Sequence, residues 1–375
     1  IGTGAQAIHP GYGLLSENAA FVEQCAQCGI TFIGPPARVI SLMGDKERAR
    51  ATMEKARVPV VPGTGLVSGA RAAYKEAKRI GTPLLVKARA GGGGRGIRRV
   101  DDLNELPTAF NAASAEAKAA FGDGGCYLEK LLQPVKHVEM QLICDEQGHV
   151  VCLGERECSV QRRNQKLLEE SPSPAVTPKL RKAMMAAAEK AARAVGYCNA
   201  GTVEFLLDTE GKFYFMEMNT RLQVEHPVTE MVTGIDLVKW QIRVADGQPL
   251  SFTQEDVQLR GHAIECRINA EDPTRNFLPS AGRVTLLHIP GGQGVRFDTA
   301  LYQDGFVPPY YDSLLGKLIV HAPSRGEAVR KMRAALGELV IQGVCHTADL
   351  QLDILEDPRF LQGDYNTHFM ENLQC

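Results

Sequence analysis

Residues 217–227 concentrate polar side chains at the end of an apolar run. They read EMNTRLQVEHP and directly follow KFYFM, so carboxylates, an arginine, a histidine and amides leave a segment with the apolar character of a buried strand. A second apolar run, TVEFLLD, precedes KFYFM, with Glu210 and Gly211 between the two. If these two residues form the loop of a tight hairpin, counting outward places Glu204 directly opposite Glu217. The two carboxylates are then expected on one face.

Two adjacent carboxylates in a buried hairpin require a partner of opposite charge. Their charges repel, and one carboxyl would be forced neutral unless a cation lay between them. Side chains alternate along a strand, so Asn219 and Arg221 are expected on the same face. Oxygen ligands without sulfur or paired histidines favour a hard ion such as Mg²⁺, usually shared with substrate phosphates. The alternative is a structural ion-pair network in which Arg221 and a neighbouring lysine satisfy both carboxylates. The hairpin is expected to be covered on both sides, with Val203, Phe205, Tyr214 and Met216 on one face and Leu206, Phe213 and Phe215 on the other.

A glycine run supplies a candidate phosphate contact. Gly91, Gly93 and Gly96 match the spacing of a dinucleotide fingerprint, but that pattern opens a helix, whereas IRRV after the glycines indicates a strand. The absence of a following Lys-Ser or Lys-Thr pair excludes a P-loop. Strand, glycine loop and strand together predict a flap whose backbone N–H groups close over phosphates, with Lys87 and Arg95 adding charge. The alternative is a mobile surface turn with Lys87 at a solvated strand end.

Residues 161–166, QRRNQK, are interpreted as a cationic wall for a small anion. A solvated basic loop is the alternative. A nucleic-acid patch is disfavoured because aromatic side chains are not interleaved and the chain carries a net charge of only -2.

Composition limits the class of protein. At 375 residues, the chain is expected to form two or three packed units, and 44% hydrophobic with 23% charged residues is typical of globular proteins. The near-neutral charge excludes a global field that recruits nucleic acid or membrane. Ten cysteines lack the spacing of a disulfide scaffold, and Cys25 and Cys28 lack two further zinc ligands nearby, which favours reduced thiols and a cytoplasmic location. No apolar run of about 18 residues and no leader are evident.

The elements that position these residues fall into α/β and α+β parts. An alternation of strand, helix and strand over residues 1–33 predicts parallel strands, and antiparallel hairpins are expected from residue 137 onward. The helix expected over 178–195 has Thr177 as its N-cap and Gly196 past its end. Because the chain starts at Ile1 inside the first unit, we expect that unit to be truncated. The expected divisions are an N-terminal α/β remainder (1–43), a helical linker (44–60), a lid with the glycine loop (61–131) and a large C-terminal domain (132–375).

Taken together, these segments resemble ATP-grasp enzymes, specifically the biotin carboxylase family. The resemblance runs along the whole chain, and its most specific motif is EMNTRLQVEHPVTE. It is also carried by IHPGYGLLSENAAF, LMGDK, AGGGGRGI, EREC, QRRNQK, HAIECRINAEDP and PPYYDSLLGKLI. It implies an ATP-grasp fold with a truncated pre-ATP-grasp domain, a small glycine-flap subdomain and a larger antiparallel-sheet domain. The implied activity is ATP- and bicarbonate-dependent carboxylation of biotin through carboxyphosphate.

The resemblance also implies site residues, by motif match. ATP would be bound by Lys46, Lys87, Gly92, Gly93, Gly94, Glu129, Lys130, Leu132, His137, Gln161 and Leu206. Magnesium or manganese would be held by Glu204, Glu217 and Asn219, and bicarbonate by Lys166, Arg221, Gln223 and Val224. The catalytic residues would be Glu225 as general base, Lys166, Arg221, and Arg267, which stabilises the biotin enolate. Tyr12 and Arg267 would face biotin. Arg221 beside Glu225 is expected to keep that base ionised.

The resemblance leaves the wider setting open. The first hypothesis is the biotin carboxylase subunit of a bacterial acetyl-CoA carboxylase, as a homodimer with a carrier protein and a carboxyltransferase as partners. The biotin-attachment motif MKM is missing from the sequence, so the carrier is expected to be another chain or region. Alternatives are a pyruvate, propionyl- or other acyl-CoA, or urea carboxylase, and, from another class, a non-catalytic nucleotide-binding module. Asn164, Arg89 and Ala90 depart from common family residues near the nucleotide.

Overall fold

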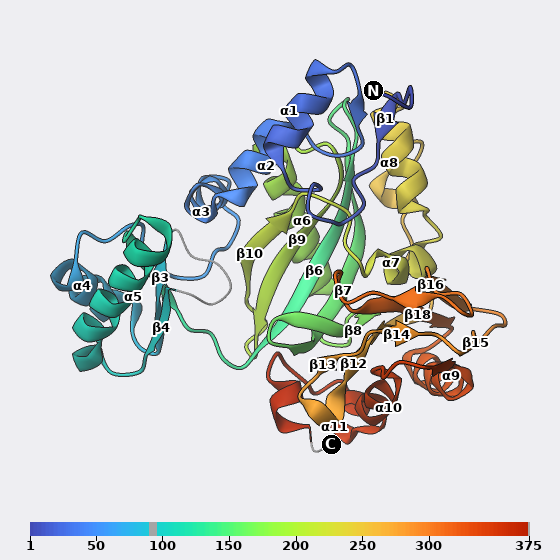
Figure 1. Ribbon diagram of the computed structural model, residues 1–375. Coiled ribbons are helices and arrows are strands. Elements are labelled where there is room, and N and C mark those ends of the chain that lie inside the picture. Colours follow the sequence, from blue (N-terminus) through green and yellow to red (C-terminus); the bar gives the residue numbers. More distant parts are fainter. Residues whose placement is uncertain (90–95, 374–375) are drawn as a thin grey trace.

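The largest sheet has eight strands in the order β10-β9-β6-β7-β8-β11-β18-β16, and neighbouring strands are antiparallel. The computed structural model describes residues 1–89 and 96–373 (Figure 1). The antiparallel hairpins expected from residue 137 onward are therefore confirmed. The strands are Val135–Cys144 (β6), Val150–Arg162 (β7), Gln165–Ser171 (β8), Asn199–Asp208 (β9), Phe213–Asn219 (β10), His262–Asn269 (β11), Val295–Thr299 (β16) and Leu314–Ala322 (β18).

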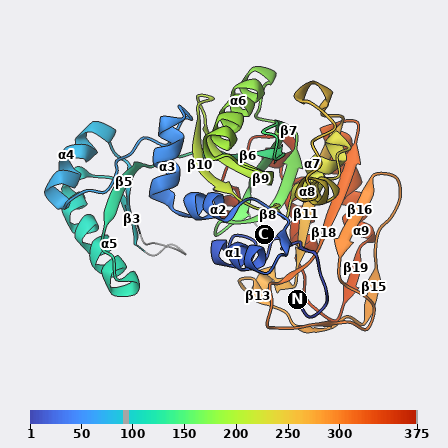
Figure 2. The ribbon, with the colours of Figure 1, turned by 90° about the horizontal axis from the view of Figure 1, so that it is seen from above.

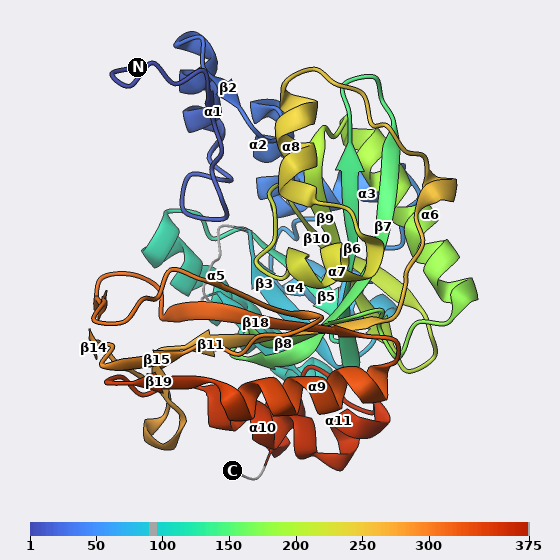
Figure 3. The ribbon, with the colours of Figure 1, turned by 90° about the vertical axis from the view of Figure 1, so that its right-hand side faces the viewer.

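This sheet is strongly twisted. In Figure 3, β6 and β7 run nearly upright while β11 and β18 cross below them, so the two halves of one sheet meet at a steep angle. On one half, the apolar stripe of α6 (Pro178–Val195) packs against β6 and β7. Thr177 caps α6 by accepting from the backbone N–H of Leu180, and Gly196 ends it, as predicted.

Both faces of the other half are covered by helices. Alternate strand residues point to opposite faces, so Ala263 and Ile319 meet α7 (His226–Thr233), whereas Ile264 and Leu318 belong to the core under α9 (Arg325–Glu338) and α10 (Ala348–Glu356). Helix α8 (Leu237–Ala245) covers β6 and β9 through Leu237.

The amino-terminal unit is small. Strands β1 (Ala7–Ile8) and β2 (Thr31–Phe32) are parallel, as predicted, and are joined by α1 (Ala19–Gln27). Helices α2 (Ala37–Gly44) and α3 (Lys46–Lys55) then lead away from it (Figure 1).

A third unit stands to one side of the large sheet (Figure 2). Its antiparallel sheet has the order β4-β3-β5, and its own core lies between that sheet and α4 (Ala70–Ile80) with α5 (Leu106–Phe121). The strands are Leu84–Ala88 (β3), Ile97–Val100 (β4) and Cys126–Lys130 (β5). Lys87 pairs with Ile97 across the glycine loop, which confirms strand, loop and strand rather than a helix.

Short elements complete the chain. They are β12 (Glu271–Asp272), β13 (Leu278–Pro279), β14 (Gly282–Arg283), β15 (Leu286–His288), β17 (Phe306–Val307), β19 (Val340–Gln342), α11 (Pro358–Gln362), and the 3₁₀ turns η1 (Leu103–Glu105), η2 (Gln254–Asp256), η3 (Pro273–Arg275) and η4 (Phe369–Asn372). Within residues 1–89 and 96–373, none of the helices has the length and apolar character needed to cross a bilayer.

The hairpin of β9 and β10 has a longer turn than predicted. Phe213 pairs with Leu207, one residue further than a two-residue loop would give. An irregularity between Phe215 and Glu217 inserts one extra residue into β10, which is the effect of a β-bulge. The bulge restores the register, so Glu217 does stand opposite Glu204 as predicted.

The bulge changes which aromatic residues face the core. Phe213 and Phe215 lie with Phe205 in the core cluster, not on the opposite face, and the rings of Phe205 and Phe213 meet edge to face at 5.3 Å. Met216 is 39% exposed. The expectation that both faces are covered is therefore wrong, because the face with the carboxylates lines a cavity.

Candidate active site

A cavity of about 590 Å³ lies at the end of β10, between the large sheet and the amino-terminal unit. It brings together the predicted residues Tyr12, Lys46, His137, Gln161, Lys166, Glu204, Leu206, Glu217, Asn219, Arg221, Gln223, Val224, Glu225 and Arg267. Val135, Asn164, Gln165, Met216 and Thr367 complete its lining. Residues that are distant in the sequence thus converge on one polar chamber.

Glu204 and Glu217 differ in what balances their charge. Burial by itself would raise the pKa of Glu204, but Lys166 and His137 outweigh it and hold that pKa well below its usual range. Within the described residues, the Glu217 carboxylate has no hydrogen bond or ion pair. Burial together with the charge of Glu204 raises its pKa. A cation at Glu217 would remove this cost.

The donor atoms near this pair fit Mg²⁺. Asn219 adds an amide, whose Nδ2 now donates to Glu204 Oε1 at 2.7 Å, and Lys46 lines the same cavity. Magnesium in proteins is bound by oxygen atoms, such as those of carboxylates and amides, together with oxygens of substrate phosphates. Glu204, Glu217 and Asn219 would therefore hold the ion, as proposed from the sequence.

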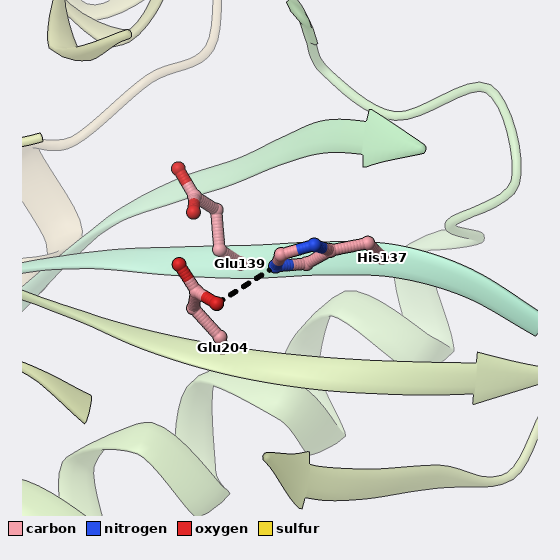
Figure 4. A group of neighbouring side chains, drawn as sticks. All are labelled: His137, Glu139 and Glu204. Carbon is pink, nitrogen blue, oxygen red and sulfur yellow. Dashed lines mark ion pairs between the residues drawn. The ribbon is translucent and has the colours of Figure 1, made fainter. Parts of the chain in front are cut away.

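A second cluster, His137, Glu139 and Glu204, also converges (Figure 4), but its two carboxylates are already paired with Arg156 and Lys166. His137 Nε2 lies 3.0 Å from Glu204 Oε2, although the two are not aligned as a hydrogen bond. Glu139 is completely buried and pairs with Arg156 at 2.5 Å and with Lys166 at 2.7 Å. Because Arg156 and Lys166 already balance its charge, Glu139 positions Lys166 and is not available to bind a metal ion.

Lys166 joins Glu204, one of the proposed metal ligands, to Glu225, the proposed base. Its ammonium donates to Glu139 at 2.7 Å, Glu204 at 3.0 Å and Glu225 at 2.6 Å. Burial alone would lower the pKa of Lys166, but these carboxylates raise it well above its ordinary value. Lys166 therefore carries a fixed positive charge.

Glu225 occupies the N-cap position of α7, and its carboxylate, which makes no capping hydrogen bond, is held between two cations. Lys166 donates to its Oε1, and Arg267 Nη2 donates to its Oε2 at 2.9 Å. Burial alone would raise the pKa of Glu225, but Lys166 and Arg267 hold it well below its usual range. The expectation that Arg221 keeps Glu225 ionised is wrong, because no ion pair joins these two residues within the described chain. Lys166 and Arg267 have that role instead.

Arg221 is instead fixed by groups around the loop after β10. Its Nε donates to Glu17 at 3.0 Å, and its Nη1 donates to Gln223 at 2.9 Å. Gln223 Nε2 in turn donates to Glu204 Oε1 at 3.0 Å. Val224 is held through its carbonyl, which accepts from Lys317 Nζ at 2.8 Å.

The predicted lid residues do not line this cavity. Lys87 forms an ion pair with Glu129, and Lys130 Nζ donates to the carbonyl of Thr82 at 2.7 Å. Leu132 is likewise absent from the described lining. Gly92, Gly93 and Gly94 lie outside the described residues.

Several charged residues of the site were missed by the sequence analysis: the exposed Glu17 and the buried Glu139, Arg156, Glu169 and Lys317. Glu139 and Arg156 pair directly across β6 and β7, and Glu169 accepts from Arg267 Nε at 2.6 Å. The charged residue inside the apolar run HVEMQLIC, and the charged residues of GEREC directly after the apolar run VVCL, were the available signal. Their partners depend on the strand order, which local sequence patterns do not reveal.

Family models match this chain along its length. They are biotin carboxylase, N-terminal domain (residues 1–40), carbamoyl-phosphate synthase L chain, ATP binding domain (45–253), and biotin carboxylase C-terminal domain (265–372). A biotin carboxylase of Nostoc sp. is 56% identical over 370 residues, which cover 98% of this chain and 83% of that protein.

Two further relatives are named after other carboxylases. One is a pyruvate carboxylase subunit of Methanothermobacter thermautotrophicus, which is 52% identical over 98% of this chain and 75% of its own length. The other is the solved biotin carboxylase domain dimer of the Hydrogenobacter thermophilus 2-oxoglutarate carboxylase, with MgADP, ADP and bicarbonate, which is 50% identical. It superimposes with a TM-score of 0.91 over 99% of this chain and 82% of that one.

Proposed function

This chain belongs to the biotin carboxylase family of ATP-grasp ligases, and we propose that it carboxylates carrier-bound biotin for an acetyl-CoA carboxylase. Its substrates and cofactors are those of the family: ATP, Mg²⁺, bicarbonate and biotin. The observation that carries the site assignment is the position of Glu225 between Lys166 and Arg267, in the same cavity as Glu204 and Glu217.

The nucleotide half of the site is proposed on the side of Glu204 and Glu217. Lys46 lies there to meet phosphate, and His137, Gln161 and Leu206 would contact the nucleoside. Mg²⁺ held by Glu204, Glu217 and Asn219 would neutralise the charge that develops during phosphoryl transfer. A positioned array of cations is the main requirement of such a transfer.

Glu225 is proposed to take the proton of bicarbonate. As it does so, a bicarbonate oxygen bonds to the γ-phosphorus, the bond from that phosphorus to ADP breaks, and carboxyphosphate forms. Lys166, Arg221, Gln223 and the backbone of Val224 would hold the anion. When bicarbonate takes over Lys166, Glu225 loses one of its two cations, which raises its pKa and makes it a stronger base.

Arg267 is proposed to act in the second half of the reaction. Carboxyphosphate splits into carbon dioxide and phosphate, the phosphate takes the proton from biotin N1′, and the nitrogen attacks carbon dioxide. The Arg267 guanidinium would stabilise the enolate of the ureido group, because it lies in the cavity beside Glu225. Tyr12 would line the biotin side.

The lid residues are proposed to act after movement toward the cavity. Lys87, Gly92, Gly93, Gly94, Glu129 and Lys130 would meet ATP when residues 61–131 close, and Leu132, which directly follows this unit, would line the adenine slot. The separate core of this unit supports treating residues 61–131 as a lid, within the proposed division into 1–43, 44–60, 61–131 and 132–375. Closure would keep water away from carboxyphosphate.

The acyl acceptor and the partners belong to this proposal. We propose a homodimer that works with a separate carrier and a carboxyltransferase, for which the acetyl-CoA carboxylase setting is the first candidate. The relative named as a pyruvate carboxylase subunit supports the second candidate. Purification of the tagged protein from its host, followed by assays of the co-purifying complex with acetyl-CoA and with pyruvate, distinguishes the two acceptors.

The activity itself is tested by ATP hydrolysis. The proposal predicts hydrolysis that depends on bicarbonate and rises when free biotin is added. Nucleotide binding without such stimulation would favour the non-catalytic nucleotide-binding module instead.

A further inference from the structure

We propose that Glu17, in the amino-terminal unit, is the positioning residue that orients Arg221 in the bicarbonate site. This inference rests on the proposed function, because it assigns to Arg221 the task of holding the anion. Glu17 and Arg221 are 204 positions apart in the sequence. The amino-terminal unit would therefore complete the anion site by orienting one of its ligands rather than by contacting the anion through this carboxylate.

The backbone of Glu17 is fixed by the turn before α1. Ser16 is buried, and its N–H and Oγ both reach the carbonyl of Gly13, at 3.1 and 2.6 Å. Asn18 then caps α1 by accepting from the N–H of Phe21 at 2.9 Å. With both neighbours held, the Glu17 side chain leaves from a defined point.

Both carboxylate oxygens of Glu17 accept hydrogen bonds from the loop after β10. Oε1 accepts from the N–H of Thr220 at 2.9 Å and from its Oγ1 at 3.1 Å. Oε2 accepts from Arg221 Nε at 3.0 Å. One carboxylate thus fixes the backbone of the loop and the guanidinium of the next residue together.

This contact decides which edge of the guanidinium faces the cavity. Glu17 occupies Nε, so the Nη atoms are turned toward Asn219 and Gln223, at 3.3 and 2.9 Å. Both of those amides also donate to Glu204. The Arg221 edge that would fork onto an anion is therefore aligned with the metal-binding carboxylate.

Stability alone is a poor explanation for this arrangement. The Glu17 side chain is 38% exposed, and ion pairs at that exposure contribute little to the free energy of unfolding. Geometry is the greater effect, because a misoriented arginine loses its bidentate contact with a planar anion.

The test compares Glu17→Ala with Glu17→Gln in the full chain, measuring KM for bicarbonate and for ATP in the biotin-stimulated hydrolysis assay. Glu23→Ala is the matched control, because Glu23 is an exposed carboxylate on α1 without a hydrogen bond or ion pair in the described structure. For Glu17→Ala we expect the bicarbonate KM to rise roughly tenfold, the scale of one charge-assisted hydrogen bond. The ATP KM and the melting temperature should stay close to those of Glu23→Ala.

Glu17→Gln keeps an acceptor for Thr220 but has no charge for Arg221, so its bicarbonate KM should lie between the other two. Equal bicarbonate KM values in Glu17→Ala and Glu23→Ala would overturn the proposal, as would a parallel rise in both substrate KM values. If Glu17→Ala is poorly folded, Glu17→Gln alone decides by the same comparison. An unmutated chain that lacks bicarbonate-dependent turnover would instead reject the proposed function, and this inference with it.

Discussion

Lys166 Nζ lies 2.6 Å from Glu225 Oε1, and the same ammonium also contacts Glu204 at 3.0 Å. One cation therefore joins the proposed base to Glu204, one of the proposed metal ligands. Any anion that draws Lys166 away from Glu225 alters the basicity of that carboxylate. In the proposed mechanism, this link makes proton removal from bicarbonate depend on the occupancy of the anion site.

Replacing Glu225 by glutamine should abolish turnover without loss of nucleotide binding. Removal of a general base typically costs about 10² to 10⁴ in rate. Calorimetric titration with ADP and a steady-state hydrolysis assay measure the two effects separately. Turnover within a factor of about three of the unmutated protein would remove Glu225 from the role of base.

Replacing Glu217 by glutamine should weaken the metal response of the protein. The magnesium-dependent increase in melting temperature at saturating ADP is expected to shrink strongly, because one of two charged ligands is lost. Without magnesium, the variant should be at least as stable as the unmutated chain, since it removes an ionisable group that has no partner within the described residues. An undiminished magnesium effect would place the ion elsewhere. Glu210→Gln, on the exposed turn, is the control.

Glu265 is expected to be a neutral acid in the folded protein. It is completely buried on β11 opposite Glu169, and both of its oxygens lack hydrogen-bond partners within the described structure. Burial raises its pKa well above 4.5, despite the charge of Lys317. The unfolded chain loses this proton at lower pH than the folded chain does, so stability falls as pH rises above about 4.5.

Glu265→Gln removes that pH-dependent loss. The free energy of unfolding of this variant, relative to that of the unmutated protein, should therefore increase from about pH 5 to about pH 8. Urea unfolding at both pH values measures this. A difference independent of pH would show that Glu265 is ionised.

The contribution of Glu170 to stability should have the opposite pH dependence to that of Glu265. Burial would raise its pKa, but hydrogen bonds from His262 and Arg325 lower it from 4.5 to about 2. Its contribution is therefore present above about pH 4.5 and is lost as pH falls toward 2. Glu170→Gln is expected to lose about 3 kcal/mol at pH 7, and the difference should shrink in acid, as followed by urea unfolding. Equal losses at pH 7 and pH 3 would contradict this account.

The sequence was sufficient for the elements and for the opposition of Glu204 and Glu217. It was not sufficient for the register of the hairpin. The longer turn and the bulge each shift the register by one residue, and the two shifts cancel before Glu217. The bulge lies next to the site and could not be seen in an alternating apolar pattern.

The sequence also did not reveal the ion-pair partners of the charged site residues. Nearness of Arg221 and Glu225 along the chain suggested an ion pair, but Arg221 turns to Glu17 and Glu225 turns to Lys166 and Arg267. Such contacts come from strands and units joined only by the tertiary fold. Local spacing carries no information about them.

The most direct test of the central claim follows oxygen atoms. If bicarbonate attacks the γ-phosphorus after losing its proton to Glu225, hydrolysis with ¹⁸O-labelled bicarbonate should place label from bicarbonate in the released phosphate, as measured by mass spectrometry. Released phosphate whose one new oxygen comes from water, with no label from bicarbonate, would show that ATP is hydrolysed without carboxyphosphate and would contradict the account.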